Sequence, residues 1–248
     1  MHFSKVFLLA IPVCLSVAVL AQGVQRDEFQ NITNFKDAIF SKSVTAFSVD
    51  NPALRSQNDS ISYDKIKGSP FWKDASQSAL LYSSTGYIGA LPVRINLATN
   101  KIYFIQNSEE MILSDNTVTK IVFQATNDSS VFISQVPNLL LNKKPVDGFV
   151  QVLNFGKYQF LKYTRRRLAS ADSPSHTSKN YYFTDDINYF IKCNDKVEAV
   201  KKLNKENLLI YLPSSSSYDT WAKENTINFK NEKDIVLFLN YYNARTSN

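Results

Sequence analysis

The sequence predicts a mainly β (α+β) protein: a curled antiparallel β-meander with short C-terminal helices packed on it. Three observations favour this class. Apolar residues alternate with polar ones in many short runs after Ala79, the connections are too short for intervening helices, and a clear helical apolar period marks the C-terminus. Some runs are apolar on both faces, which indicates a curled sheet, barrel-like or half-open, or a sheet covered by helices.

The N-terminus has the parts of a secretory signal peptide. Lys5 precedes an apolar run over residues 6–21, and Val19 and Ala21 occupy the small-residue positions expected before a cleavage site. The run contains Pro12 and is shorter than the roughly 20 apolar residues of a membrane-spanning helix. We therefore expect residues 1–21 to be removed, export to a periplasmic or extracellular location, and no transmembrane span in the mature protein.

The composition of the mature chain limits the classes of function. Without the leader, Cys193 and His176 are its single thiol and single imidazole, so an internal disulfide is excluded and the fold must depend on burial. With 44% hydrophobic and 13% aromatic residues, the chain can form a sizeable core. The formal net charge of the full chain is +6, which becomes +5 when Lys5 is removed with the leader. This charge is mild, and we expect no nucleic acid among the partners.

The mature chain begins with a lead-in and continues into a β domain. Residues 22–65 are polar and weakly patterned, which predicts a partly ordered segment. The antiparallel β domain is expected over residues 66–203, opening at "GSPFW", where Phe71 and Trp72 would cover the edge of the core. In "LPVRINL" the apolar residues alternate with Pro92, Arg94 and Asn96, which is typical of a half-buried strand.

Later strands follow at short intervals, in "IYFIQ", "MIL", "TVTKIVFQ", "SVFIS" and "FVQVLNFGKYQFLKY". In the last of these, Phe149, Leu153 and Phe155 face one way and Val150 and Val152 the other. Gly156 marks a reversal between two strands. Both faces of this part of the sheet are therefore expected to be covered.

Two interpretations compete after residue 185. Asn194 and Asp195 favour a hairpin turn between "NYFIKC" and "KVEAVKKL", whereas Asp195 followed by Glu198 resembles a helix capping box. We favour the hairpin, followed by a short helix at about residues 205–212. In the C-terminal segment, residues 204–248, Asn231 caps a helix whose apolar face is expected to pack on the sheet.

Taken in order, "GSPFW", "LPVRINLATNKIYF", "GFVQVLNFGKYQFLKY" and "NFKNEKDIVLFLNYYN" resemble a family of exported, β-rich bacterial proteins with no established activity. The family pattern has a G-S-P-[FY]-W opening, a V-R-x-N strand and a C-terminal helix ending in Y-Y-N. The resemblance covers about residues 66–243 and implies a fold, but no chemistry. Ile95 stands where the family more often has an aromatic residue, and the run Ser214–Ser217 interrupts the tail.

Four arginines are the candidate ligand-binding residues. Arg94 lies opposite the apolar face of its strand, either paired with a carboxylate at the rim or placed in the concavity of the sheet to hold an anion. Arg165, Arg166 and Arg167 precede a serine-rich loop and could bind phosphate, an anionic glycan or lipid headgroups. The alternative is a solvated strand end, in which Arg166 points away from its two neighbours.

No set of residues predicts catalysis, a metal or a cofactor. Cys193 is expected to pack as a small buried hydrophobe, and His176 lies in the serine-rich loop. The acidic pairs Glu109-Glu110 and Asp185-Asp186 are interpreted as turns. One histidine and one cysteine cannot form a zinc site unaided.

We therefore expect an exported, non-enzymatic module that acts by binding, or as a structural partner, at the cell envelope. Its partner would be an envelope component or a small ligand. A barrel-like carrier of an apolar or amphipathic ligand is one alternative, suggested by strands that are apolar on both faces. A carboxylate-dependent hydrolase is the other, because a sequence does not show which acidic residues converge.

Overall fold

The computed structural model describes residues 40–42, 46–47, 61–62, 65–106, 108–113, 117–124, 130–172, 179–213 and 216–246. The expected signal peptide of residues 1–21, most of the lead-in of residues 22–65 and His176 lie outside the described residues.

The first half of the sheet is the antiparallel meander that the alternating pattern predicts. Its strands are β5 (Gln77–Ser83), β6 (Gly86–Asn96), β7 (Lys101–Gln106) and β8 (Glu109–Leu113). Each pairs with the next, and β1 (Phe40–Lys42) pairs with β8 at the edge. The chain then crosses back, so that β9 (Lys120–Phe123) pairs with β5.

The second half continues from β9 as another antiparallel series. Its strands are β10 (Val131–Ile133), β13 (Val150–Val152), β14 (Tyr158–Asp172), β15 (Lys179–Cys193) and β16 (Lys196–Val200). The strand β4 (Ile66–Lys67) pairs in parallel with β15, so the sheet is mixed. Within the described residues, the twelve strands form one open sheet with β1 and β16 as its outer strands, rather than a barrel-like one.

Two small hairpin-like sheets lie outside this path. One pairs β2 (Ala46–Phe47) with β3 (Ile61–Ser62), and the other pairs β11 (Leu140–Leu141) with β12 (Lys144–Pro145). Three helices follow the sheet, α1 (Lys205–Leu209), α2 (Ser216–Glu224) and α3 (Glu232–Thr246). The prediction of a mainly β protein with short C-terminal helices is confirmed.

The helices begin where the sequence places side-chain caps. The Asn204 side chain accepts a hydrogen bond from the Asn207 backbone N–H at 2.8 Å, and Asn231 does the same for Lys233 at 2.8 Å. Helix α2 was not predicted, because its serine-rich start has weak helix propensity. Its aromatic contacts to α3 stabilise it instead, with the Trp221 ring stacked 3.9 Å from the Tyr241 ring.

Two of the turns between strands were predicted from the sequence. Asn194, with φ of +54°, and Asp195 form the two-residue turn between β15 and β16, which confirms the hairpin. Gly156 has φ of +128°, and an added Cβ there would lie 2.6 Å from the Asn243 side chain. The turn needs glycine for both reasons.

Three buried clusters hold the sheet. In the first half, Val93, Ile95 and Phe123 are buried, and the Trp72 ring lies 4.9 Å from the rings of Phe123 and Phe132. The expected cover over the core edge is therefore confirmed. Asn96, predicted to face solvent, is fully buried, because its side chain accepts hydrogen bonds from the Ala98 and Thr99 N–H groups of the following turn.

The other two clusters lie on opposite faces of β13 to β16. On one face, Phe160 and Ile191 pack against Phe238 and Leu239 of α3. On the other face, the cluster contains Leu139, Val150, Val152, Leu161, Tyr163 and Phe190. The prediction that both faces are covered is confirmed. The prediction is wrong for Phe155, because β13 ends at Val152 and the Phe155 side chain is 61% exposed before the Gly156 turn.

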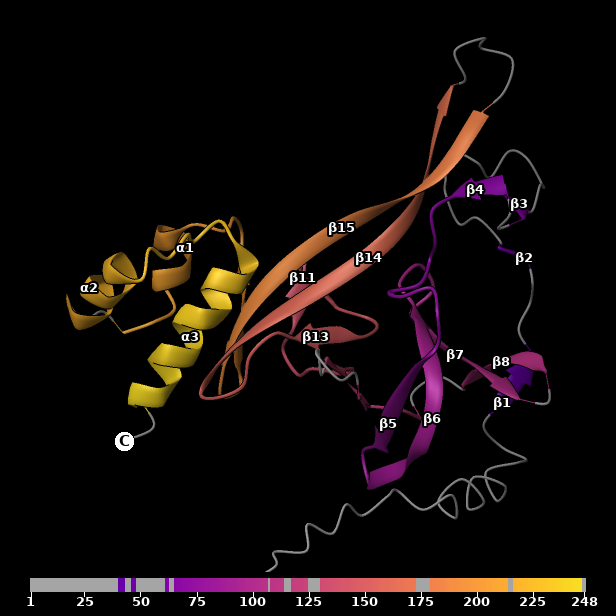
Figure 1. Cartoon of the computed structure of the whole chain (residues 1–248), viewed down its shortest axis with the longest axis horizontal. Helices are drawn as coiled ribbons and strands as arrows, with labels where there is room; N and C mark the ends of the chain where they lie inside the picture. The colour runs from indigo at the N-terminus through magenta and orange to yellow at the C-terminus, as the bar shows by residue number, and fades with distance from the viewer. Residues whose placement is uncertain are drawn as a thin grey trace, which may run out of the picture.

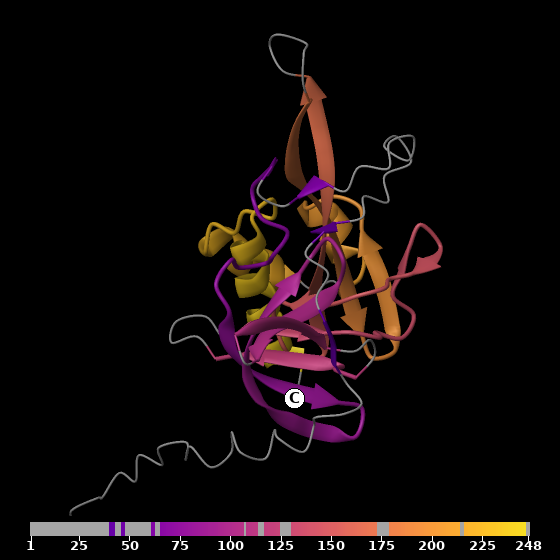
Figure 2. The same ribbon diagram turned by 90° about the vertical axis from the view of Figure 1, so that its right-hand side faces the viewer.

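The longest element is the two-stranded ribbon of β14 and β15, fifteen residues in each strand. We call residues 158–163 and 188–193 its base, and residues 165–172 and 179–186 its tip. Figure 1 shows the helices beside the base, the β5–β8 meander at the opposite end of the molecule, and β4 beside the tip. In Figure 2 the tip projects beyond the rest of the sheet.

Two acidic pairs lie in strands rather than in the predicted turns. Asp185 and Asp186 are in the middle of β15, opposite Arg166 and Arg165. The opposite charges across the ribbon make an extended strand favourable at a sequence that looks turn-like. Glu109 and Glu110 begin β8, and the preceding turn is at Ser108, which has φ of +64°.

Candidate functional site

Arg94, the first predicted site residue, is half-buried and contacts other residues of the fold. Its guanidinium forms an ion pair with Glu110 on β8 and lies over the Phe71 ring, 3.7 Å from the ring centre. It also donates a hydrogen bond to the Asp74 backbone oxygen at 3.2 Å. Pairing with a nearby carboxylate was one of the two interpretations of Arg94, and the structure shows that pairing.

Arg166 also contacts the "GSPFW" segment. Its Nη1 donates to the backbone oxygens of Ser69 at 2.7 Å and Phe71 at 2.6 Å. Its Nε and Nη2 donate to the two carboxylate oxygens of Asp185, at 2.6 and 3.1 Å. Because all these donors are used inside the fold, Arg166 attaches the ribbon to the "GSPFW" segment.

Arg165 and Arg167 point the opposite way from Arg166, as the alternation of a strand requires. Both are exposed, whereas Arg166 is half-buried. Arg167 donates to the Asp186 carboxylate at 2.5 Å, across the ribbon. The four predicted arginines are thus not gathered at one site, and their role as ligand-binding residues stays a prediction.

The attachment by Arg166 places β4 against the tip of the ribbon. Gly68 follows β4 directly and has φ of +90°, which turns the chain from β4 toward Ser69. An added Cβ on Gly68 would lie 4.0 Å from the Phe183 Cβ on β15. Strand β4 then pairs with β15 through Ile66, opposite Tyr181, and Lys67, opposite Tyr182.

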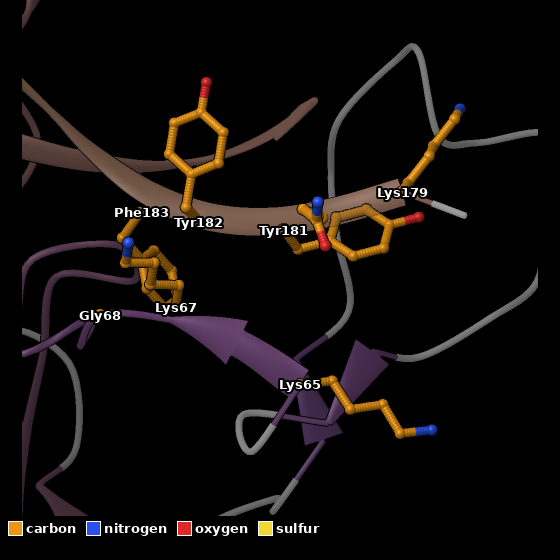
Figure 3. A pocket seen from close by; sticks show the side chains of 8 residues that line it. Lys65, Lys67, Gly68, Lys179, Tyr181, Tyr182 and Phe183 are labelled. Atoms are coloured by element: carbon orange, nitrogen blue, oxygen red, sulfur yellow. The ribbon is translucent and has the colours of Figure 1, made fainter. Parts of the chain in front are cut away.

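A groove of about 750 Å³ lies where β4 meets the tip. Its lining is basic, aromatic and amide side chains with one glycine, namely Lys65, Lys67, Gly68, Lys179, Asn180, Tyr181, Tyr182 and Phe183. Figure 3 shows Lys67 beside Phe183 at one end, and the Tyr181 ring between Lys65 and Lys179 at the other. The volume is within the range of small-molecule binding sites.

In the described lining of the groove, the charged side chains are all lysines. Its three lysines are exposed, and no carboxylate is among the described residues that line it. Over the part of the chain that the structure describes, Lys65, Lys67 and Lys179 also form no ion pair. Elsewhere Arg94, Lys162, Arg166 and Arg167 each have an acidic partner. A concave surface of this kind attracts anions.

The groove residues were not predicted. Lys65 and Lys67 fall at the boundary of the weakly patterned lead-in, and the aromatic triplet Tyr181–Phe183 follows the serine-rich loop. The signal in the sequence is two basic residues beside "GSPFW" and one lysine beside three aromatics. These segments are more than a hundred residues apart in the chain, and only the parallel pairing of β4 with β15 brings them together.

A second, smaller cavity of about 240 Å³ lies near the turn after β6. Its lining includes Asn100, whose amide donates to the Asp147 backbone oxygen at 2.9 Å, and Gly148, whose position leaves room for the Asn100 side chain. Asn100 thereby holds the 147–149 segment against the first meander, and Ser134, which also lines the cavity, donates to the Val118 backbone oxygen. These two polar side chains are already used within the fold.

The thiol and the buried tyrosines lie under the helices. Cys193 is half-buried and packs on the same cluster as Tyr189 and Ile191. Burial, and then the neighbouring Cys193, raise the pKa of Tyr158. Burial chiefly raises the pKa of Tyr242 to about 12 and raises that of Tyr189, which also donates a hydrogen bond to the Glu232 carboxylate.

Among the described residues, no three His, Cys, Asp or Glu side chains gather as a metal site would require. Within the same residues, no helix has the length and apolar character needed to cross a membrane. Comparison of the chain with family models, curated proteins and solved structures gives no match.

Proposed function

We propose that this protein is an exported, non-enzymatic binding module of the cell envelope, and that the groove between β4 and β15 binds an anionic ligand. The observation that carries the proposal is the presence of Lys65, Lys67 and Lys179 along one groove without a carboxylate in its described lining. Three exposed ammonium groups repel one another in the free protein, and an anion relieves that repulsion.

The two alternatives have less support from the geometry. A carrier needs an enclosed apolar interior, whereas the sheet is open and the large groove is basic. A hydrolase needs converging carboxylates, whereas Glu110, Asp185 and Asp186 each bind an arginine in the fold. Export is supported by the leader over residues 1–21.

Binding of labelled dextran sulfate, measured by fluorescence anisotropy, tests the groove. The groove variant is Lys65→Gln/Lys67→Gln/Lys179→Gln. Its matched control, Lys143→Gln/Lys144→Gln/Lys201→Gln, removes the same charge from exposed lysines outside the groove. Since an exposed ion pair contributes about 0.5 kcal/mol, we expect the groove variant to bind about tenfold more weakly, and the control about as well as the native chain.

Salt provides the second measurement. The affinity of the native chain should fall steeply as the salt concentration rises, because exposed charges are screened. Equal losses in the groove variant and in the control would show that the overall charge, and not the groove, holds the polymer. That result would overturn the proposed function.

A further inference from the structure

We infer that the ligand of the groove is an acidic polysaccharide, whose charged groups bind the lysines while a sugar ring stacks on Tyr181. This inference depends on the proposed function, because it names the class of anion that the groove binds. It starts from three features of the described residues: the spread of the lysines, the position of the aromatic rings and the amide of Asn180.

The lysines are spread along the groove and do not surround a single point. Lys67 lies at the end near Gly68 and Phe183, whereas Lys65 and Lys179 lie at the other end, on either side of the Tyr181 ring (Figure 3). Extended strand rises about 3.3 Å per residue, so the stretch from Lys179 to Phe183 is about 13 Å long. A polymer with charges repeated along its length fits this arrangement better than a compact ion.

The aromatic side chains give the groove an apolar surface between its charges. Tyr181 is half-buried, and its ring lies between two of the lysines. An aromatic face packs against the C–H face of a sugar ring, and the phenol hydroxyl can bond to sugar hydroxyls. Inorganic polyphosphate has charge but no apolar face, so it would leave Tyr181 unused.

The remaining polar group also suits a sugar. Asn180 lines the groove, and its amide offers both donors and an acceptor, the pattern that vicinal hydroxyls need. The lysines are flexible point charges, which adapt to carboxylate, sulfate or phosphate groups at variable spacing. A membrane surface is less well matched, because the groove is concave.

The test compares two carboxylate chains that differ in their backbone. Oligogalacturonate carries its carboxylates on sugar rings, and polyglutamate with the same number of carboxylates has none. Affinities are measured by calorimetric titration of the full chain at fixed salt, together with Tyr181→Ala, Tyr181→Phe and the exposed control Tyr87→Ala, 51% exposed in the native chain. Inorganic polyphosphate and anionic phospholipid vesicles are the further probes.

We expect oligogalacturonate to bind about fivefold to tenfold more tightly than polyglutamate. Tyr181→Ala should remove this preference, whereas Tyr181→Phe, which keeps the ring, and Tyr87→Ala should retain it. Superimposable circular dichroism spectra and melting temperatures will show that a loss comes from the ring and not from unfolding.

Two results separate failure of the inference from failure of the proposed function. If oligogalacturonate binds no better than polyglutamate, polyphosphate or the vesicles, and Tyr181→Ala has no effect, the sugar inference is overturned while the anion-binding groove stands. If the native chain binds none of these probes, and dextran sulfate also fails to bind, both are overturned.

Discussion

The base and the tip of the β14–β15 ribbon belong to the same two strands but are held in different ways. At the base, residues 158–163 and 188–193 are covered on one face by the helices and on the other by the Leu139 cluster. At the tip, Leu168 is the only buried residue among those that the structure describes. Ion pairs between the strands and the pairing of β4 with β15 hold this part of the ribbon.

One pair of strands thus forms part of the core at its base and lines the basic groove at its tip. Burial of aromatic and aliphatic side chains stabilises the base. The tip is attached by Arg166 and β4, and its aromatic and basic side chains line the groove. Substitutions in the two regions should therefore differ in their effects on stability and on binding.

Truncation of one aromatic residue in each region gives the largest contrast. Phe160→Ala, at a fully buried position of the base, should lower the free energy of unfolding by about 3–5 kcal/mol because it leaves a cavity. Tyr182→Ala, at the tip, should change it by less than about 1 kcal/mol. Urea denaturation followed by circular dichroism measures both. Similar losses would contradict the division into base and tip.

Within the tip, Arg166 and Arg167 should contribute differently to the free energy of unfolding. Arg166→Met should cost about 1–3 kcal/mol, because the hydrogen bonds to the Ser69 and Phe71 oxygens and to Asp185 are lost. Arg167→Met removes one exposed ion pair and should cost about 0–1 kcal/mol.

Dextran sulfate binding by Arg166→Met and Arg167→Met tests whether Arg166 also positions the groove. Arg166→Met should weaken binding, because it releases the segment that positions β4 beside the groove. A weaker effect of Arg166→Met than of Arg167→Met on both stability and binding would refute the attachment by Arg166.

The pH dependence of stability reports on the base. The tyrosine pKa is about 10 in an unfolded chain and is raised to about 12 for Tyr242 in the fold, so at high pH the unfolded state loses its proton first. The contribution is therefore fully present below about pH 10 and is lost as the pH rises toward 12. Tyr242→Phe should flatten this part of a stability–pH curve, and an unchanged slope in this variant would contradict the assignment.

Much of the fold outside the tip could be predicted from the sequence. Short-range patterns determine it: the alternation of Val93 and Ile95, the Asn194-Asp195 turn, the Asn231 cap and the apolar face of α3. Helix α2 was not predicted, because its serine-rich start has weak helix propensity and the helix depends on the contact of Trp221 with Tyr241 of α3.

The tip could not be predicted in the same way. Asp185-Asp186 looks like a turn until Arg166 and Arg167 are known to lie across the ribbon. The groove requires the pairing of Lys67 with Tyr182, and no periodicity reports a pairing between segments so distant in the chain. The arginines were predicted as site residues because three of them follow one another in the sequence. A charge that is already paired within the fold is less available to a ligand than an unpaired lysine.

Residue-resolved hydrogen exchange, with and without oligogalacturonate, tests the division of the ribbon most directly. We expect amides at 158–163 and 188–193 to exchange only through global unfolding, and amides at the tip to exchange faster. Adding oligogalacturonate should slow exchange at residues 65–67 and 179–183 and leave the base unchanged. Equal protection along the whole ribbon, or slowing confined to the base, would contradict the account.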